Sequence, residues 1–193
     1  MAVNKSPLLI SVVGTSGSGK TSTIEYLTAH LTKLGFRVGV AKHVHLEGFT
    51  IDTEGKDTWK HARAGARIVV AASPDELAAI KKTAHEAKFK EIKRILLSED
   101  LDLIFLEGFS KATARRQRVY KIVEAKDARD LKYTLARTHA PILAITGHVT
   151  ESKRIRNSPA RLLNVQRESP LITPIVRRLP PRRGRRPVWS SRP

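Results

Sequence analysis

A phosphate-binding pattern near the N-terminus is the clearest chemical signal in the chain. Residues 14–21 read GTSGSGKT, which matches the pattern GxxxxGK(S/T) at every position. In such a loop the glycines let the backbone curl, so that successive N–H groups point at phosphate oxygens, and the next helix adds the partial positive charge of its N-terminus. The alternative is a glycine-rich turn without a ligand. An apolar run before the loop and a helical pattern after it disfavour this alternative. The residues predicted to bind phosphate are Gly14, Thr15, Ser16, Gly17, Ser18, Gly19, Lys20, Thr21 and Ser22.

Two side chains at the end of this loop have separate predicted roles. The Lys20 ammonium is expected to reach the β and γ phosphates of a nucleotide. The Thr21 hydroxyl is expected to hold Mg²⁺. The loop therefore predicts binding of a nucleoside triphosphate together with magnesium.

Two carboxylates flank a later apolar run, and only one is expected near the phosphates. Asp102 begins the run and Glu107 ends it. A strand of this length separates their backbones by roughly 16 Å, and ligands of such sheets lie beyond the carboxyl ends of the strands. Glu107 is therefore the predicted Mg²⁺ or water-orienting residue, whereas Asp102 is expected to be a solvated residue at the start of the strand.

The same rule places a polar loop over the phosphates. Lys42 and His43 end the second predicted strand, and His45, Asp52 and Asp57 follow in the loop. We predict that Lys42, His43 and His45 line an anionic pocket, and that Asp52 and Asp57 are catalytic candidates, with Asp52 also near the metal.

Each prediction for this loop has an alternative. His43 and His45 could chelate a metal together with His61, although the chain offers no cysteine to support such a site. Asp57 could instead be the N-cap of the helix that follows it.

The elements that must position these residues alternate along the chain. Apolar runs predict strands over residues 8–13, 37–42, 67–72, 102–106 and 141–145, and periodic patterns predict helices over 20–34, 57–66 and 85–97. Gly35 is the expected stop after the first helix. Alternation of this kind predicts an α/β fold with a doubly wound, mostly parallel sheet, the three-layer α/β/α arrangement of P-loop NTPases.

Charge divides the chain into two parts. Of its 193 residues, 36 are Lys or Arg and 18 are Asp or Glu. Residues 1–148 hold 24 basic and 16 acidic groups, whereas residues 149–193 hold 12 and 2, with no Lys after Lys153. We predict a nucleotide-binding domain over residues 1–158 and an Arg/Pro-rich, poorly ordered basic tail over residues 159–193.

The composition also excludes several classes of protein. The chain has no cysteine, which rules out disulfides, thiolate metal sites and a Cys nucleophile. Its longest apolar runs fall far short of the roughly 18 residues that a membrane span needs. We therefore expect a cytoplasmic protein without a membrane partner.

Beyond the phosphate loop, several motifs carry a family resemblance. They read VGVAKHVH over residues 38–45, IDTEGKDT over 51–58, HARAGA over 61–66 and DLIFLEGF over 102–109, followed by KIV at 121–123. With these motifs, residues 8 to about 146 resemble the molybdopterin-guanine dinucleotide biosynthesis protein B (MobB) family of P-loop GTP-binding proteins.

The resemblance implies a specific function. It implies a weakly hydrolysing GTP-binding protein that assists the attachment of GMP to molybdopterin, as a homodimer beside a MobA-type nucleotidyltransferase. GTP and Mg²⁺ are the implied cofactors, with molybdopterin as bound substrate or product. Guanine preference comes from the resemblance, because no Asn/Thr-Lys-x-Asp motif is visible in the sequence. The implied phosphate and metal residues are Gly17, Gly19, Lys20, Thr21, Asp52, Asp57 and Glu107.

Two other functions stay open at this stage. A P-loop small-molecule kinase would use Asp52 or Asp57 as the base that accepts a proton. A nucleic-acid-binding protein would act through the basic tail, but Trp189 is the only aromatic residue there, so a stacking platform is missing. Hydrolysis is expected to be slow, since no arginine finger is identified in the chain.

Overall fold

The computed structural model describes residues 6–151 and 172–179, and the chain divides into two compact units. The first unit comprises Met1–His43 and Ile92–Pro193, and the second comprises Val44–Glu91. The predicted boundary at residue 158 and most of the predicted tail lie outside the described residues. No helix in the described ranges is long and apolar enough to cross a membrane.

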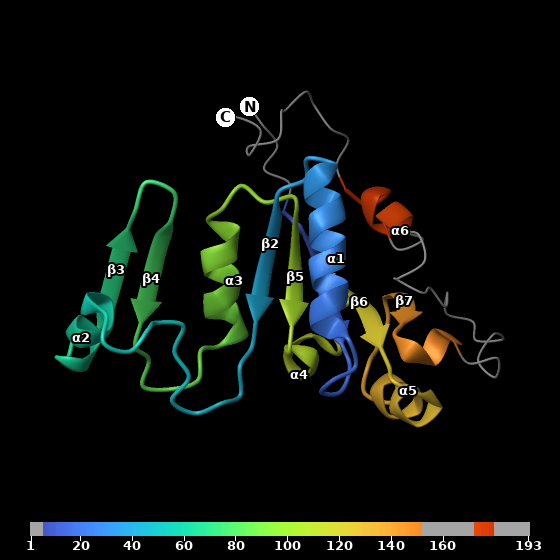
Figure 1. Cartoon of the computed structure of the whole chain (residues 1–193). Helices are drawn as coiled ribbons and strands as arrows, with labels where there is room; N and C mark the ends of the chain where they lie inside the picture. The colour runs from blue at the N-terminus through green and yellow to red at the C-terminus, as the bar shows by residue number, and fades with distance from the viewer. Residues whose placement is uncertain (1–5, 152–171, 180–193) are drawn as a thin grey trace. The chain divides into compact units, whose positions relative to one another are not determined.

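The first unit is built on a five-stranded parallel sheet. Its spatial order is β2-β5-β1-β6-β7, and the arrows of β2 and β5 in Figure 1 point to the same end of the sheet. Apolar side chains dominate these strands because both faces of the sheet are covered. The strands are β1 (Leu8–Val13), β2 (Val38–Lys42), β5 (Leu103–Glu107), β6 (Val119–Glu124) and β7 (Ile142–Thr146).

Helices cover both faces of this sheet, as the sequence predicts. On one face, Ile10 and Val12 of β1 pack with α1 (Lys20–Lys33) and α6 (Ile172–Val176). On the other face, Val13 packs with α5 (Ala128–Leu135) and the 3₁₀ helix η1 (His148–Glu151). The short helix α4 (Ser110–Thr113) also lies there, since the Thr113 hydroxyl donates to the Ser11 hydroxyl. The predicted three-layer α/β/α fold is therefore confirmed.

Helix α1 follows its predicted bounds closely. Ile24, Leu27 and Leu31 are buried on one side of the helix, at helical spacing. Gly35 follows the C-cap with φ +79, and its N–H donates to the Thr32 carbonyl. The predicted glycine stop is thus confirmed, because a left-handed residue ends the helix at low cost only when it is glycine.

The second unit holds a separate, smaller sheet. Strands β3 (Ile68–Ala72) and β4 (Leu77–Lys81) pair antiparallel, beside helix α2 (Asp57–Arg63). The sequence places residues 67–72 in the doubly wound sheet, and that prediction is wrong. Only four residues separate β3 from β4, too few for the crossover that a parallel pair needs, and the Ser73 N–H closes the turn on the Glu76 carbonyl.

Several elements escape the sequence pattern. Strands β4 and β6 and helices α4, α5 and α6 are not predicted, and α3 (Phe89–Leu97) begins four residues later than expected. Helix α6 falls within the predicted tail, yet Ile175 and the following Leu179 are buried in the core against α1. This part of the predicted tail therefore belongs to the folded first unit.

Candidate phosphate-binding site

The start of helix α1 is open to an anion. Its N-cap is Gly19, with φ +104, and no side chain caps the helix or places an acidic group in its first turn. The first N–H groups of a helix have no partner within the helix and carry its partial positive charge. Helix α1 therefore presents donors and positive potential at the phosphate loop, as the sequence predicts.

The loop itself packs tightly against the end of β6. A Cβ at Gly14 would lie 2.4 Å from the Glu124 carbonyl oxygen, so only glycine allows this close approach. Across the loop, the Ser18 hydroxyl is buried and has no hydrogen-bond partner among the described residues. An unpaired polar atom costs free energy when it is buried, so this hydroxyl suits a ligand that offers an acceptor.

Lys20 lies across the loop. Its Nζ donates to the Thr15 carbonyl oxygen at 2.5 Å. Burial lowers the pKa of Lys20, although the carboxylates of Glu107, Glu124 and Asp130 act in the opposite direction. The ammonium thus stands among three carboxylates at the point where phosphates are expected.

The two predicted magnesium ligands of the first unit meet in the structure. The Thr21 hydroxyl donates to Glu107 Oε1 at 2.8 Å. Lys42 Nζ lies 3.3 Å from the same oxygen, because Lys42 and Glu107 are register partners at the carboxyl ends of β2 and β5. Two predicted site residues, Thr21 and Lys42, therefore converge on the buried carboxylate of a third, Glu107.

His43 continues this edge of the site. Its N–H donates to the Glu107 carbonyl oxygen at 2.8 Å, and its ring centroid lies 5.4 Å from that of Phe109. Gly108 has φ +82, and a Cβ there would lie 2.8 Å from the His43 carbonyl oxygen. The sequence Glu-Gly-Phe thus holds His43 beside Glu107.

From the sequence, Asp102 is expected to be solvated, and that prediction is wrong. Its two carboxylate oxygens accept hydrogen bonds from the Arg37 guanidinium at 2.9 and 3.1 Å, and its side chain is only 18% exposed. The hydrogen bond to Asp102 also raises the pKa of Arg37. Asp102 is therefore not a solvated residue but a partner that ties the start of β5 to the residue before β2.

Three predicted residues lie in the second unit. Asp52 Oδ1 accepts hydrogen bonds from the Thr53 N–H and the Thr58 hydroxyl. Asp57 is the first residue of α2, its side chain is 87% exposed, and it pairs with Lys60 at 3.2 Å. The N-cap of α2 is Lys56, so the alternative reading of Asp57 as N-cap is wrong. Roles for His45, Asp52 and Asp57 at the phosphates stay predictions.

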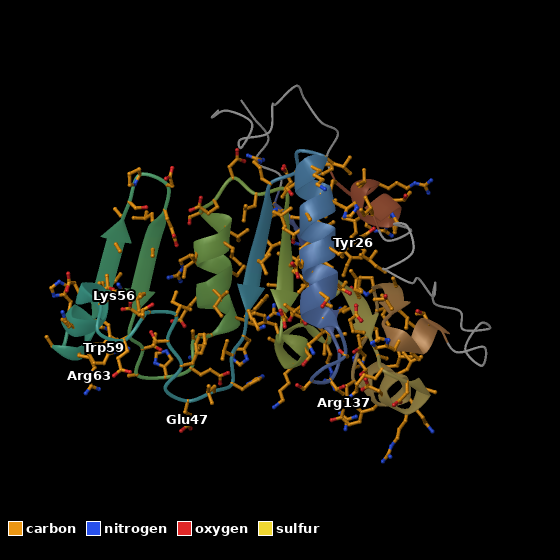
Figure 2. The ribbon with its side chains drawn as sticks, viewed as in Figure 1. Tyr26, Glu47, Lys56, Trp59, Arg63 and Arg137 are labelled. Carbon is orange, nitrogen blue, oxygen red and sulfur yellow. The ribbon has the colours of Figure 1, made fainter. Side chains whose placement is uncertain are left out.

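Aromatic and basic side chains also meet on helix α2. The Arg63 guanidinium lies 5.5 Å from the Trp59 ring centroid, and Figure 2 labels both side chains with that of Lys56. The two residues are one helical turn apart and Arg63 is exposed, so the contact contributes modestly to the stability of α2.

The structure adds polar residues that the sequence did not indicate. Asp130 Oδ2 accepts hydrogen bonds from the Thr15 hydroxyl and the Lys126 N–H, both at 3.0 Å. Glu124 accepts one from the Thr23 hydroxyl at 2.5 Å. Glu124 ends β6, and Asp130 lies in α5, the helix that follows β6. The sequence does not predict β6. Had it done so, the carboxyl end of this strand, and Glu124 with it, would have been expected at the phosphate loop.

Comparisons with known proteins agree with this fold. The family model of molybdopterin guanine dinucleotide synthesis protein B (MobB) matches residues 9–146. The molybdopterin-guanine dinucleotide biosynthesis adapter protein of Haemophilus influenzae is 34% identical over 108 residues, which are 56% of this chain and 60% of that protein. The adapter protein of Escherichia coli is 31% identical over 121 residues, 62% of this chain and 66% of that protein. Each match thus spans less than two thirds of the relative.

Solved structures show the same architecture. A crystal structure of molybdopterin-guanine biosynthesis protein B superposes with a TM-score of 0.63 at 29% identity, covering 88% of this chain and 97% of that chain. The MobB structure from Bacillus subtilis gives 0.68 at 21% identity, covering 89% and 98%, which shows the shared fold. Because the family model also covers well over half of the chain, this protein belongs to the molybdopterin guanine dinucleotide synthesis protein B family.

Proposed function

We propose that this chain is a cytoplasmic GTP-binding adapter of molybdenum cofactor biosynthesis that assists the attachment of GMP to molybdopterin. One observation carries the nucleotide part of the proposal: helix α1 starts with no capping side chain, and its first two residues are Lys20 and Thr21, whose hydroxyl contacts Glu107. The names of its relatives, which are adapter proteins of molybdopterin-guanine dinucleotide biosynthesis, support the pathway.

The donor set fits a nucleotide phosphate with magnesium. The N–H groups at the start of α1 and the Lys20 ammonium would hold phosphate oxygens, and the buried Ser18 hydroxyl gains a partner there. Thr21 and Glu107 offer the hard oxygen ligands that Mg²⁺ prefers. Bound Mg²⁺ would supply neutralisation of the phosphate charge.

The same contacts support weak hydrolysis. A carboxylate that orients water must offer an oxygen to that water. Glu107 Oε1 already accepts the Thr21 hydroxyl and lies against Lys42 Nζ. Asp57 is exposed and pairs with Lys60. These carboxylates are engaged in pairs that stabilise charge, which favours binding over fast turnover.

A nucleotide titration tests this proposal. GTP and ATP are titrated into the protein with Mg²⁺ by calorimetry, and GTP is expected to bind more tightly. Lys20→Ala should abolish binding, whereas Lys33→Ala, which removes an exposed lysine from the last turn of the same helix, should leave it unchanged. Binding of neither nucleotide, or full affinity in Lys20→Ala, would refute the proposal.

We also propose that the protein is a homodimer, and the small sheet supports this. Ile68, Val70 and Leu77 are more than half exposed on one face of the β3–β4 pair. A two-stranded sheet is marginally stable by itself, so covering this apolar face with a second copy would stabilise it. Val70→Asp is expected to give monomers in sedimentation experiments, and Lys82→Asp, just beyond β4, should not.

The proposed partner is a MobA-type nucleotidyltransferase. The tagged protein is incubated with cell extract in the presence of GTP and Mg²⁺, and bound proteins are identified by mass spectrometry. A molybdopterin nucleotidyltransferase should be retained, and bound pterin should be detectable by its fluorescence after oxidation. Retention of neither would contradict the adapter role while leaving nucleotide binding intact.

A further inference from the structure

A buried carboxyl group lies directly behind the phosphate loop. Glu124 is the last residue of β6 and only 1% exposed. Its Oε1 accepts the Thr23 hydroxyl at 2.5 Å, one turn into α1. Its Oε2 faces two glycines, since a Cβ at Gly19 would lie 3.4 Å from it and a Cβ at Gly147 would lie 3.0 Å away. The carboxyl therefore contacts α1, the phosphate loop and the turn after β7 at once.

The charges around this carboxyl do not neutralise it fully. Lys20 of α1 is the cation that favours its charged form. Lys20 also interacts with Glu107 of β5 and Asp130 of α5, and Lys42 of β2 opposes the charge of Lys20. Lys20 is thus shared by three carboxylates, of which Glu107 also has Lys42 Nζ at 3.3 Å, and Glu124 is the most deeply buried of the three. Burial raises the pKa of Glu124 to about 7, against the lowering influence of Thr23 and Lys20.

We propose that Glu124 is a positioning residue that couples nucleotide binding to proton uptake: its neutral form admits the phosphates to the loop, and its charged form repels them. The inference rests on the proposed nucleotide binding and adds a residue that this binding alone does not require.

The physical reason is competition for one positive region. A carboxylate beside the N-terminus of a helix is stabilised by the helix dipole and by nearby ammonium groups. Phosphates bound at the start of α1 would draw on the same helix end and on Lys20. An anionic phosphate brought close to a buried carboxylate raises the pKa of that carboxyl, so the binding of phosphate favours the protonated form, which takes its proton from solvent.

Protonation leaves the contacts of Glu124 in place. A neutral carboxyl still has an oxygen that accepts the Thr23 hydroxyl, so the end of β6 stays attached to α1. The amide of Gln offers the same acceptor without titrating. Glu124→Gln is therefore a permanent copy of the neutral form.

The test compares the dissociation constant of Mg²⁺·GTP for the wild-type protein and Glu124→Gln between pH 5.5 and 8.5. The ratio of the wild-type to the mutant constant removes the titration of the nucleotide itself. Below the pKa the wild-type carboxyl is protonated, so the ratio should be close to one; above it the ratio should rise, by up to about tenfold per pH unit, until the carboxyl ionises in the complex as well. Glu25→Gln, an exposed change on α1, should give a flat ratio near one.

A second variant and a direct signal complete the experiment. Thr23→Val removes a hydrogen bond that favours the charged carboxyl, so the rise in the ratio should begin at higher pH. ¹³C NMR follows the side-chain carboxyl carbon of Glu124, whose signal is assigned by its loss in Glu124→Gln. This signal should titrate near neutral pH, and its pKa should rise when GTP is added. A ratio that does not change with pH, or a carboxyl that is already ionised at pH 6, would overturn the inference alone. Failure of both proteins to bind GTP would overturn the proposed function and this inference with it.

Discussion

Helices α1 and α5 begin at the same edge of the sheet, yet their N-termini differ in kind. Each follows a parallel strand, α1 after β1 and α5 after β6. Helix α5 is closed by Asp127, whose side chain accepts the Asp130 N–H at 2.8 Å, and Asp130 adds a carboxylate to the first turn. Helix α1 has neither a capping side chain nor an acidic residue there.

The difference shows which helix end serves stability and which serves binding. An N-cap side chain such as Asp stabilises a protein by about 1 kcal/mol relative to alanine, and the Gly19 N-cap of α1 makes no such side-chain hydrogen bond. Helix α5 uses the contribution and also supports the loop, because Asp130 accepts the Thr15 hydroxyl. Helix α5, whose N-terminus is capped, thus supports the phosphate loop that leads into the N-terminus of α1, where no side chain caps the helix.

The largest effect on GTP affinity is expected from Gly19→Ala, which changes the N-cap of α1 itself. At φ +104 an alanine is strained, and its Cβ would lie 3.4 Å from Glu124 Oε2. We expect destabilisation of about 1–2 kcal/mol and loss of most GTP affinity, because the first N–H groups of α1 would turn away from the phosphates. Urea unfolding and calorimetry with GTP measure the two effects. Gly55→Ala, also at positive φ but in open space in the second unit, is the control for strain alone and should keep its GTP affinity.

A smaller effect is expected from Thr21→Val, which keeps the open helix end but removes the hydroxyl beside Glu107. The variant loses the 2.8 Å hydrogen bond and the proposed metal ligand. GTP affinity with Mg²⁺ should fall by roughly tenfold, the effect of one hydrogen bond to a charged group. Affinity without Mg²⁺ should change little, and so should both affinities in Thr32→Val, the same change at an exposed threonine near the other end of α1. Equal losses with and without the metal would argue against Thr21 as a ligand.

The sequence predicts helix α1 and the elements around its N-terminus well. The loop, α1, β2 and β5 carry strong local signals: a complete phosphate motif, apolar residues at helical spacing and uninterrupted apolar runs. These elements bring Thr21, Lys42 and Glu107 into contact as expected, and Lys20 interacts with the same carboxylate.

The sequence does not predict strand β6 and helix α5 because the signals for them are not local. Strand β6 carries Lys121 at its centre, which interrupts the apolar run, yet this lysine is fully buried and donates to the Arg116 and Ala140 carbonyl oxygens. Those partners are 5 and 19 residues away and are assembled only by the fold. Because β6 is not predicted, no local pattern places Glu124 or Asp130 at the phosphate loop.

Asp127→Ala tests the closed helix end and should affect stability alone. Removing the cap leaves the Asp130 N–H without its partner. We expect a loss of about 1 kcal/mol in the free energy of unfolding, as for other N-cap residues, with GTP affinity unchanged within twofold. Asp75→Ala, an exposed change in the turn between β3 and β4, is the matched control. A large loss of GTP affinity in Asp127→Ala would mean that the two helix ends are not separable in function.

The smallest effect is expected from Asp130→Asn, which keeps a closed helix but removes its first-turn charge. The Asn oxygen can still accept the Thr15 hydroxyl and the Lys126 N–H, so the loop stays attached. The lost interaction with the dipole of α5 should cost about 0.3–1 kcal/mol in urea unfolding at low ionic strength, and less at high salt. GTP should bind slightly more tightly, because Lys20 then interacts with one carboxylate fewer. Weaker binding would instead show that the charge of Asp130, and not only its hydrogen bonds, keeps the open end of α1 ready for phosphate.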